Sequence, residues 1–328
     1  MIKKIVALFC VFTLLISTGC VKEEKTSSFT VIDQAGREVT LEKPAQKVAS
    51  GYYISTTILI GLGQTDKLTG VEMKAETRPI YKLAAPEVLD LPALGNKKMF
   101  NVEECAKAQP DVVFLPVSLK DYVDDLEALD IQTILLAPET EEGFEKAVEL
   151  IGQVMGCTDR VEEYFTYQEK VLETYEVDEE VETKVYFAGS DVLSGAGELM
   201  YQEEILDYAG AENALDIESE TWVNVDAETL LKANPDVIFI EQGNLTVESF
   251  TEDPRFQEVN AVKNHQVYMF PSLIETWDTP GLSSLLGKIW AASIIHPELV
   301  SKEDVEKESQ KFYSQFYGFD CGKEDLGI

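Results

Sequence analysis

Arginine is scarce in this sequence, and basic residues are few altogether. The 328 residues include 27 lysines and arginines against 60 aspartates and glutamates, which gives a formal net charge of −33 at pH 7. So acidic a chain repels the phosphate backbone of nucleic acids, and this excludes nucleic-acid binding through a basic face. The arginines are Arg37, Arg78, Arg160 and Arg255.

Histidine and cysteine are also too few to build a metal centre or a disulfide framework. The two histidines, His265 and His296, are not clustered, so we expect no zinc or manganese site made of protein ligands alone. Beyond the first twenty residues the cysteines are Cys105, Cys157 and Cys321, an odd number without metal-ligand spacing. We expect buried thiols, or one isolated reactive thiol.

The N-terminus has the pattern of an export signal. Lys3 and Lys4 precede an apolar run at 5–16, which is too short to span a bilayer but has the length of a signal-peptide core. The following Cys20 resembles the lipidated residue of a bacterial lipoprotein, although Ser17 stands where leucine is usual.

We therefore predict a lipoprotein signal peptide at 1–19 and, at 20–28, a lipidated Cys20 with a flexible tether. The tether is polar and cannot pack a core. An ordinary secretory signal or a core helix is the alternative interpretation of the apolar run.

One segment of the chain is repeated. Residues 107–115, KAQPDVVFL, reappear at 232–240 as KANPDVIFI. The proline ends a helix, and the apolar run after it is typical of a strand buried on both faces of a parallel sheet. Each copy thus predicts a helix, a Pro-Asp turn and a parallel strand. A period of 125 residues is too long for a solenoid and indicates two similar α/β lobes.

We predict a Rossmann-like N-terminal lobe at 29–157, a connecting helix at 158–178 and a C-terminal lobe at 179–328. The connecting segment lacks glycine and proline beyond residue 157, so it predicts one rigid helix of about 30 Å. Shorter patterns predict a hairpin at 29–33 and 38–41, strands at 47–50, 68–71, 131–136, 184–188 and 266–270, and helices at 56–62 and 203–209.

The order of these elements resembles the class III substrate-binding proteins of ABC importers, which bind siderophores, haem and vitamin B12. The resemblance covers about residues 29–317 and is carried by VIDQAGREV at 31–39, KVAS at 47–50, TILIGLG at 57–63 and AVKNHQVYMFP at 261–271. It implies an α/β fold of two lobes with parallel-sheet cores, joined by a single long helix, with a ligand cleft between them. The family usually has glycine where His265 stands, so we expect a positive φ there.

The resemblance implies that loops at the carboxyl ends of the strands hold the ligand, as in other open α/β sheets. Aromatic side chains give such loops wide apolar contact with one polar tip. Trp290 instead has the helical spacing of a core residue. Core packing, or a surface ion pair for Arg78, is the alternative for each candidate. The candidate ligand-binding residues are Tyr52, Tyr53, Met73, Arg78, Tyr81, Trp222 and Trp277.

We expect the cargo to be a metal chelate of the ferric siderophore type, with cobalamin or another corrinoid, haem, and a nickel or cobalt chelate as alternatives. The scarcity of arginine favours a neutral or weakly charged chelate, because a triply anionic ferric catecholate needs several cationic donors. Lysines would otherwise supply that charge; the candidates are Lys74, Lys82, Lys97 and Lys98.

The resemblance also implies an ABC permease and its ATPase as partners. In the family one acidic residue on each lobe docks on the permease, and Glu103 and Glu228 occupy equivalent positions in the repeat. Alternatively, both glutamates only favour a helix dipole. We expect a monomer, held outside the cell membrane by its N-terminal lipid, with neither a cofactor nor a nucleic-acid partner.

Enzyme motifs are missing. The sequence has no Gly-x-Ser-x-Gly, no phosphate-binding loop and no Gly-x-Gly-x-x-Gly, and the Gly-Ala-Gly at 195–197 is a weak signal. We therefore predict that the protein is not an enzyme. An extracytoplasmic enzyme and a purely structural surface lipoprotein are the competing classes.

Overall fold

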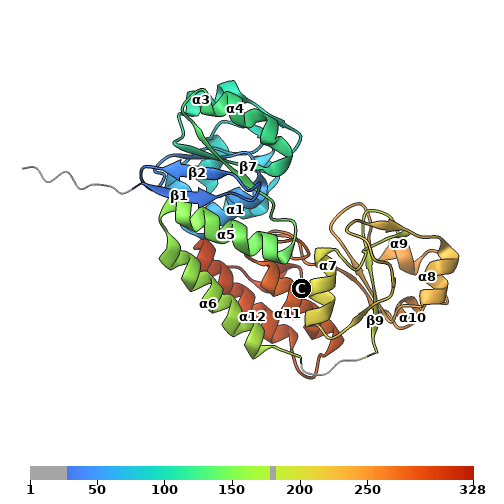
Figure 1. The fold of residues 1–328 in the computed structure, drawn as a ribbon. Coiled ribbons are helices and arrows are strands. Elements are labelled where there is room, and N and C mark those ends of the chain that lie inside the picture. The colour runs from blue at the N-terminus through green and yellow to red at the C-terminus, as the bar shows by residue number, and fades with distance from the viewer. Residues whose placement is uncertain (1–27, 178–181) are drawn as a thin grey trace, which may run out of the picture.

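The computed structural model describes residues 28–177 and 182–328. It shows two α/β lobes that both stand on a layer of long helices (Figure 1). The predicted signal peptide, Cys20 and nearly all of the predicted tether lie outside the described residues. Within the described residues, no helix combines the length and apolar character needed to cross a membrane.

The first lobe is built on a four-stranded parallel sheet in the order β4-β3-β7-β8. Its central strand β7 is buried at every position, as its apolar run predicts. The predicted hairpin is confirmed, with Phe29 opposite Leu41. The strands are β1 (Phe29–Ile32), β2 (Glu38–Leu41), β3 (Val48–Ser50), β4 (Leu68–Gly70), β5 (Gly95–Asn96), β6 (Met99–Phe100), β7 (Val112–Pro116) and β8 (Gln132–Leu136).

The second lobe has a six-stranded mixed sheet. Its core is the parallel trio β9-β13-β14, to which β11 adds a parallel strand, while β10 and β12 pair antiparallel. The predicted strand at 184–188 is confirmed to the residue. The strands are β9 (Lys184–Ala188), β10 (Ser194–Gly195), β11 (Glu212–Asn213), β12 (Val223–Asn224), β13 (Val237–Ile240) and β14 (Val267–Met269).

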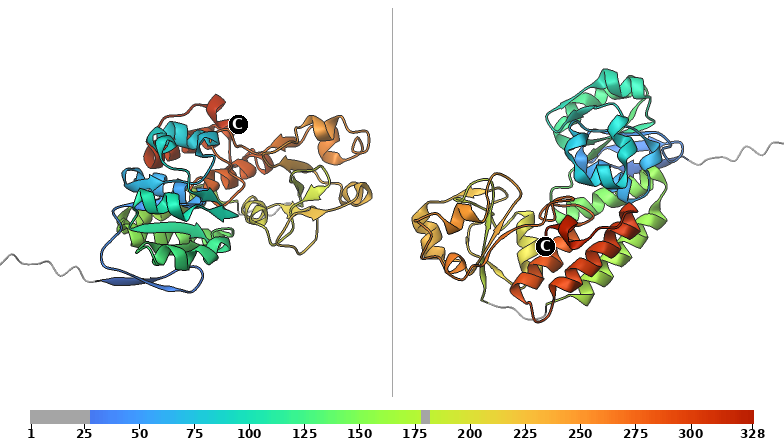
Figure 2. Two further views of the ribbon diagram at one scale, coloured as in Figure 1. Left: turned by 90° about the horizontal axis from the view of Figure 1, so that it is seen from above. Right: turned by 180° about the vertical axis from the view of Figure 1, so that it is seen from behind.

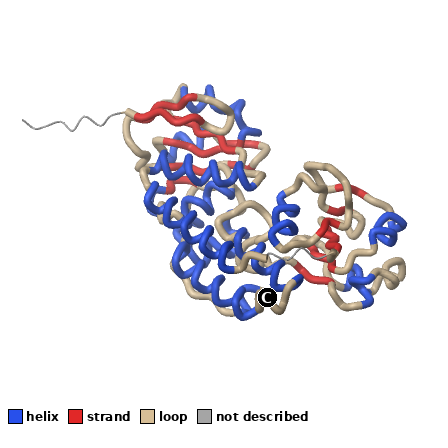
Figure 3. The backbone as a smooth tube through the Cα atoms, turned by 60° about the horizontal axis from the view of Figure 1, so that its bottom comes forward, coloured by secondary structure: helices blue, strands red, loops and turns tan. Residues whose placement is uncertain are grey.

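Helices cover the faces of both sheets and fill the space beneath them (Figure 3). Helices of the first lobe and its base are α1 (Tyr53–Gly61), α2 (Pro79–Ala84), α3 (Val102–Ala108), α4 (Val123–Glu127), α5 (Glu141–Met155) and α6 (Thr158–Thr174). The remaining helices are α7 (Tyr201–Tyr208), α8 (Ala227–Ala233), α9 (Glu248–Thr251), α10 (Asn260–Lys263), α11 (Ser284–Ile295), α12 (Lys302–Phe312) and α13 (Lys323–Leu326).

The sequence repeat is a structural repeat. An Asn or Asp side chain caps the N-terminus of each matching helix: Asn101 caps α3 and Asp226 caps α8. Each helix ends in a left-handed residue, Gln109 with φ 50° and Asn234 with φ 46°, directly before the proline. These shared turns explain why the repeat persists at the level of sequence.

The segment predicted as the connecting helix contains α6, which ends at Thr174 rather than at 178. Seventeen residues give it a length of about 25 Å. Figure 2 shows that α6 runs beside α11 and α12 along the base of the molecule, and α11 packs on α6, α7 and α12. The chain therefore returns from the second lobe, so 284–317 belongs to a common base rather than to a separate C-terminal lobe.

Three contacts join the base, the first lobe and the segment between β14 and α11. The Tyr164 hydroxyl donates to the carbonyl of Leu282 (3.1 Å), which links α6 to the segment before α11. The buried Lys288 Nζ of α11 lies 2.7 and 2.9 Å from the two carboxylate oxygens of Glu141 on α5. The backbone N–H of Ile80 donates to the carbonyl of Ile274 (3.1 Å), so the segment after β14 is bound directly to the first lobe.

Two further predictions from sequence are confirmed. His265 has φ 57°, as its place in a glycine-favouring turn predicts. Trp290 is buried and lies 4.6 Å from Phe270, ring centre to ring centre.

The repeated helix ends allow a matched test of backbone strain. Gln109 is exposed and left-handed, so Gln109→Gly should raise the free energy of unfolding by about 0.5–1 kcal/mol. Asn234→Gly should gain less or lose stability, because Asn tolerates this conformation and Asn234 Oδ1 accepts from the Asn260 N–H (2.9 Å). Urea unfolding of both variants checks this; equal effects would contradict it.

Candidate ligand site between the lobes

A stacked arginine and tyrosine form the centre of the site. Tyr53 is the first residue of α1, and Arg78 directly precedes α2. The Arg78 guanidinium carbon lies 4.2 Å from the centre of the Tyr53 ring, a cation–π contact. Burial raises the pKa of the Tyr53 hydroxyl, and Arg78 opposes that shift.

A buried glutamate fixes the orientation of Arg78. Glu72 follows β4 and is 3% exposed. Its Oε1 accepts from Arg78 Nε (3.0 Å) and from the Tyr81 hydroxyl (2.8 Å), and its Oε2 accepts from the Thr56 hydroxyl (2.7 Å). Because Nε is the only Arg78 nitrogen engaged among the described residues, the two terminal nitrogens remain available for a ligand.

Two cavities meet at this arginine and tyrosine. The first, of about 390 Å³, lies in the first lobe and is lined by Gly51, Tyr52, Tyr53, Glu72, Met73, Lys74, Arg78, Asn96, Lys97 and Lys98. The second, of about 460 Å³, lies between the first lobe and the segment after β14. It is lined by Tyr53, Thr57, Thr77, Arg78, Pro79, Ile80, Gln242, Ser272, Leu273, Ile274, Glu275, Thr276, Thr279, Pro280 and Gly281.

The first cavity is strongly cationic. Lys74, Lys97 and Lys98 line it together with Arg78, while its one described acid, Glu72, is paired with Arg78. A chain with a net charge of −33 thus gathers four cationic side chains at one opening. Such a concentration attracts anions and holds them by charge-assisted hydrogen bonds.

Two glycines permit this arrangement. A Cβ at Gly51 would lie 2.6 Å from the Leu115 side chain and 2.9 Å from the Phe100 ring, so a larger residue here would force these core side chains to shift. Gly95 has φ 145°, and a Cβ there would lie 2.2 Å from the carbonyl oxygen of Met99. Gly95 therefore closes the β5–β6 hairpin, whose turn carries Lys97 and Lys98.

Two acids of the segment after β14 lie near the site, and of these only Glu275 lines the inter-lobe cavity. Burial raises the pKa of Glu275 and of Asp278 to about 7 each, and Glu241 adds to the shift of Asp278. Glu275 as a whole residue is half-buried, yet its Oε1 is shielded from solvent and has no hydrogen-bond partner among the described residues. The raised pKa of Glu275 therefore follows from the burial of its carboxyl group, even though other atoms of the residue are exposed.

Four predicted ligand-binding residues line the cavities, namely Tyr52, Tyr53, Met73 and Arg78. Tyr52 is mostly buried and its hydroxyl donates to Glu139 (3.0 Å), so this hydroxyl is already engaged within the protein. Met73 is 43% exposed at the rim.

Two other predicted ligand-binding residues lie outside the described linings of both cavities. Tyr81 is fully buried beneath Arg78 and supports Glu72. Trp277 is 1% exposed, and its Nε1 donates to the Tyr313 hydroxyl (2.9 Å) of the returning C-terminal segment. Trp277 is therefore a core residue of the base.

Trp222 and the two predicted docking glutamates lie apart from the cavities. Trp222 is half-buried and packs against Gly189 at the end of β9, outside the described linings of both cavities. Glu103 and Glu228 are both exposed, each in the first turn of its repeated helix.

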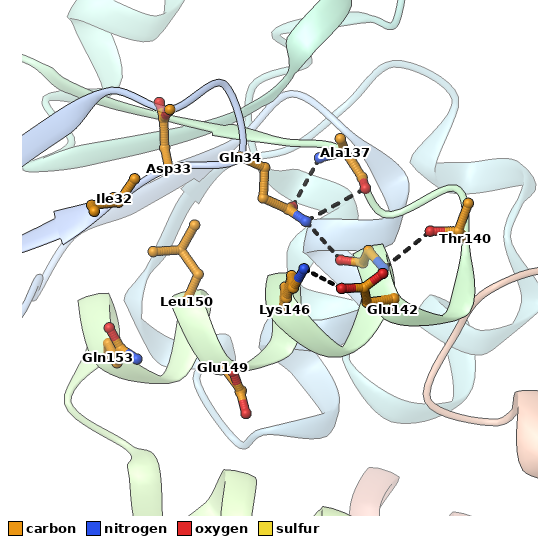
Figure 4. Close-up of a pocket in the computed structure, with 12 residues that line it drawn as sticks. Ile32, Asp33, Gln34, Ala137, Thr140, Glu142, Lys146, Glu149, Leu150 and Gln153 are labelled. Atoms are coloured by element: carbon orange, nitrogen blue, oxygen red, sulfur yellow. Dashed lines mark hydrogen bonds and ion pairs between the residues drawn. The ribbon is translucent and has the colours of Figure 1, made fainter.

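A larger cavity of about 570 Å³ lies elsewhere, between the β1–β2 hairpin and α5. Figure 4 shows Gln34 bridging its wall; the Gln34 amide nitrogen donates to the carbonyl of Gly143 (2.8 Å). Lys146 pairs with Glu142 there, so the polar groups satisfy each other. None of its described lining residues lines either of the two cavities at Arg78.

The sequence analysis did not identify two residues of the site: Gln242, which lines the inter-lobe cavity, and Glu139, which binds the Tyr52 hydroxyl. Gln242 follows β13, and Glu139 follows β8, so both stand at carboxyl ends of strands where the topological rule would have found them. Within the described chain, no group of three or more His, Cys, Asp or Glu side chains is arranged to hold a metal ion.

Comparison with known proteins decides the family. The profile of the periplasmic binding protein family matches residues 48–273, which is more than half of the chain. The chain belongs to the periplasmic binding protein family. Proteins of this family bind a solute outside the cytoplasm for an ABC importer with its permease and ATPase, and they are not enzymes.

Individual relatives support this membership. The binding protein is 22% identical to the molybdate-binding protein MolA of Haemophilus influenzae over 317 residues, 88% of this chain and 90% of that one. It is 27% identical to the uncharacterized ABC transporter substrate-binding lipoprotein YvrC of Bacillus subtilis over 261 residues, 75% and 80% of the two chains. A periplasmic solute binding protein from Veillonella parvula superimposes with TM-score 0.81 at 22% identity, covering 92% of this chain and 96% of that one.

The buried acids predict a pH dependence of stability. Their folded pKa values are raised, so the protonated forms favour the native state, and this stabilisation is lost as pH rises from about 4 through 7. The free energy of unfolding should fall by on the order of a few kcal/mol over that range. Urea unfolding at pH 5 and pH 8 measures it; Glu275→Gln with Asp278→Asn should flatten the profile, and an unchanged slope would contradict the assignment.

Proposed function

We propose that this binding protein captures an anionic metal chelate of the ferric siderophore type and delivers it to an ABC permease. The observation that carries the proposal is the Arg78–Tyr53 pair, surrounded by three lysines, at the junction of the two cavities. The guanidinium and ammonium groups suit the charge of the chelate, and the tyrosine face suits its flat aromatic donors.

The charge of the cavity changes the expected cargo. The sequence favoured a neutral or weakly charged chelate because arginine is scarce. Lys74, Lys97 and Lys98 line the cavity with Arg78, so lysine supplies the cationic donors that arginine does not. An anionic chelate, such as a ferric catecholate, therefore fits this wall better than a neutral hydroxamate or corrinoid does.

Molybdate is the second candidate cargo. It is an anion that the same cationic side chains would bind, and the relative MolA is named for it. Two adjoining cavities with an aromatic wall suit a larger ligand than one oxyanion, and this favours the chelate.

We also propose that the protein is anchored through a lipid on Cys20. The sequence of the apolar run and Cys20 supports this, and one relative, YvrC, is named a lipoprotein. The tether would keep the receptor near its permease and raise its effective concentration there.

A titration with matched arginine variants tests the cargo. Calorimetry with a ferric catecholate, a ferric hydroxamate, cobalamin, haem, a nickel chelate and molybdate should show tightest binding of the ferric catecholate to the wild type. Arg78→Gln should weaken that binding at least about tenfold, the loss of one charge-assisted contact.

Arg255→Gln is the control, because Arg255 also pairs with a carboxylate and also stacks on an aromatic ring, 4.9 Å from the centre of Phe256. It should leave affinity unchanged. Tightest binding of a neutral chelate, with no effect of Arg78→Gln, would refute the proposal.

Docking on the permease is proposed for Glu103 and Glu228. The structural repeat supports it, since both are exposed in matching helices, one on each lobe. A pair of equivalent carboxylates suits a permease with two-fold symmetry.

Glu103→Ala combined with Glu228→Ala should abolish cargo uptake by cells that carry the permease, while purified protein keeps its affinity. Glu38→Ala with Glu252→Ala is the control, as these glutamates are exposed on other surfaces of the two lobes. Normal uptake by the Glu103/Glu228 variant, or weakened cargo binding, would contradict the docking role.

A further inference from the structure

The two cavities differ in charge: the first is cationic, whereas the second has one cation and one acid. The first-lobe cavity has four cationic side chains and one acid that is already paired. Among the described residues that line the inter-lobe cavity, the charged side chains are Arg78, shared between both cavities, and Glu275. A ligand that extends from one cavity into the other therefore meets cations at one end and a carboxyl group at the other.

One carboxyl oxygen of Glu275 makes no hydrogen bond within the described residues. Its Oε1 is buried and no hydrogen-bond partner in the described chain reaches it. A buried carboxylate oxygen without a partner is costly, so a native protein that keeps one at a cavity wall has either an unexplained strain or a missing partner. Glu275 is the one acid among the described residues that line the inter-lobe cavity.

The surroundings of Glu275 disfavour the ionised form of its carboxyl group. Burial raises its pKa to about 7, while Arg78 and the hydroxyls of Ser283 and Tyr313 lower it less strongly. The other titratable groups that interact with its charge are Tyr164 of α6 and Tyr317 at the C-terminal end of the base. Arg78 is the one cation among these described neighbours, and its salt bridge is with Glu72 rather than with Glu275.

We infer that the cargo is zwitterionic: its anionic chelate portion lies against Arg78 and the lysines, and a protonated amine on it binds the Glu275 carboxylate in the inter-lobe cavity. The inference rests on the proposed function and names the cargo more narrowly. The amine would supply the partner that Oε1 lacks, and it would place positive charge on the second-lobe side of the cleft.

The test uses two probes that differ in one charge. One is the ferric complex of the bis-catecholamide of spermidine, whose central amine is protonated at pH 8. The other is the same complex after N-acetylation of that amine. The wild type should bind the amine form about tenfold more tightly at pH 8, and Glu275→Gln should remove this preference while still binding the acetylated form.

Asp278→Asn is the matched control, because Asp278 is a buried acid of the same segment that lies outside the described lining of the cavity. It should keep the preference. Thermal unfolding of each variant confirms that it is folded.

The outcomes separate this inference from the proposed function. Equal binding of the two probes by the wild type, or a preference that survives Glu275→Gln, overturns the inference alone. A loss of both probes by equal factors in Glu275→Gln also overturns it, since Glu275 would then only shape the cavity. If the wild type binds neither probe, the catecholate cargo and this inference both fail.

Discussion

The site depends on one buried carboxylate. Glu72 accepts hydrogen bonds from Arg78, Tyr81 and Thr56, and so joins the end of β4 to α1 and to the start of α2. Without its hydrogen bond to Glu72, the Arg78 side chain would be flexible. In a protein with a net charge of −33 it would then meet many competing carboxylates. Held by its Nε, it keeps a defined stack on Tyr53 and directs its remaining donors to the cleft.

The helical base limits how far the two lobes can move around the cleft. The α6 helix connects the lobes, and the chain then returns through α11 and α12 to pack against it. The Ile80–Ile274 hydrogen bond and the Lys288–Glu141 pair further fix the first lobe to the segment after β14 and to α11. Wide hinge closure would have to break these contacts, so ligand binding is expected to adjust side chains and loops at the cleft more than the lobes themselves.

Local patterns predicted the fold well and the site only in part. Pro-Asp turns, buried apolar runs and helix caps are short-range signals, and they identified the repeat, the lobes and α6. Tyr53 and Trp277 both follow strands and have polar neighbours, yet one faces the cleft and the other is core. The difference arises because Tyr313 returns from 36 residues further along the chain to bind Trp277. The positions of Lys97 and Lys98 at the cavity likewise depend on where the β5–β6 hairpin packs, and no local sequence pattern specifies that.

A double-mutant cycle on Glu72 and Arg78 tests the central claim most directly. Calorimetry would measure affinity for a ferric catecholate in wild type, Glu72→Gln, Arg78→Gln and the double variant, with thermal unfolding to confirm that each is folded. If Glu72 acts by holding Arg78, the double variant should bind about as weakly as Arg78→Gln alone. Losses that add, or full affinity in Glu72→Gln, would contradict the account.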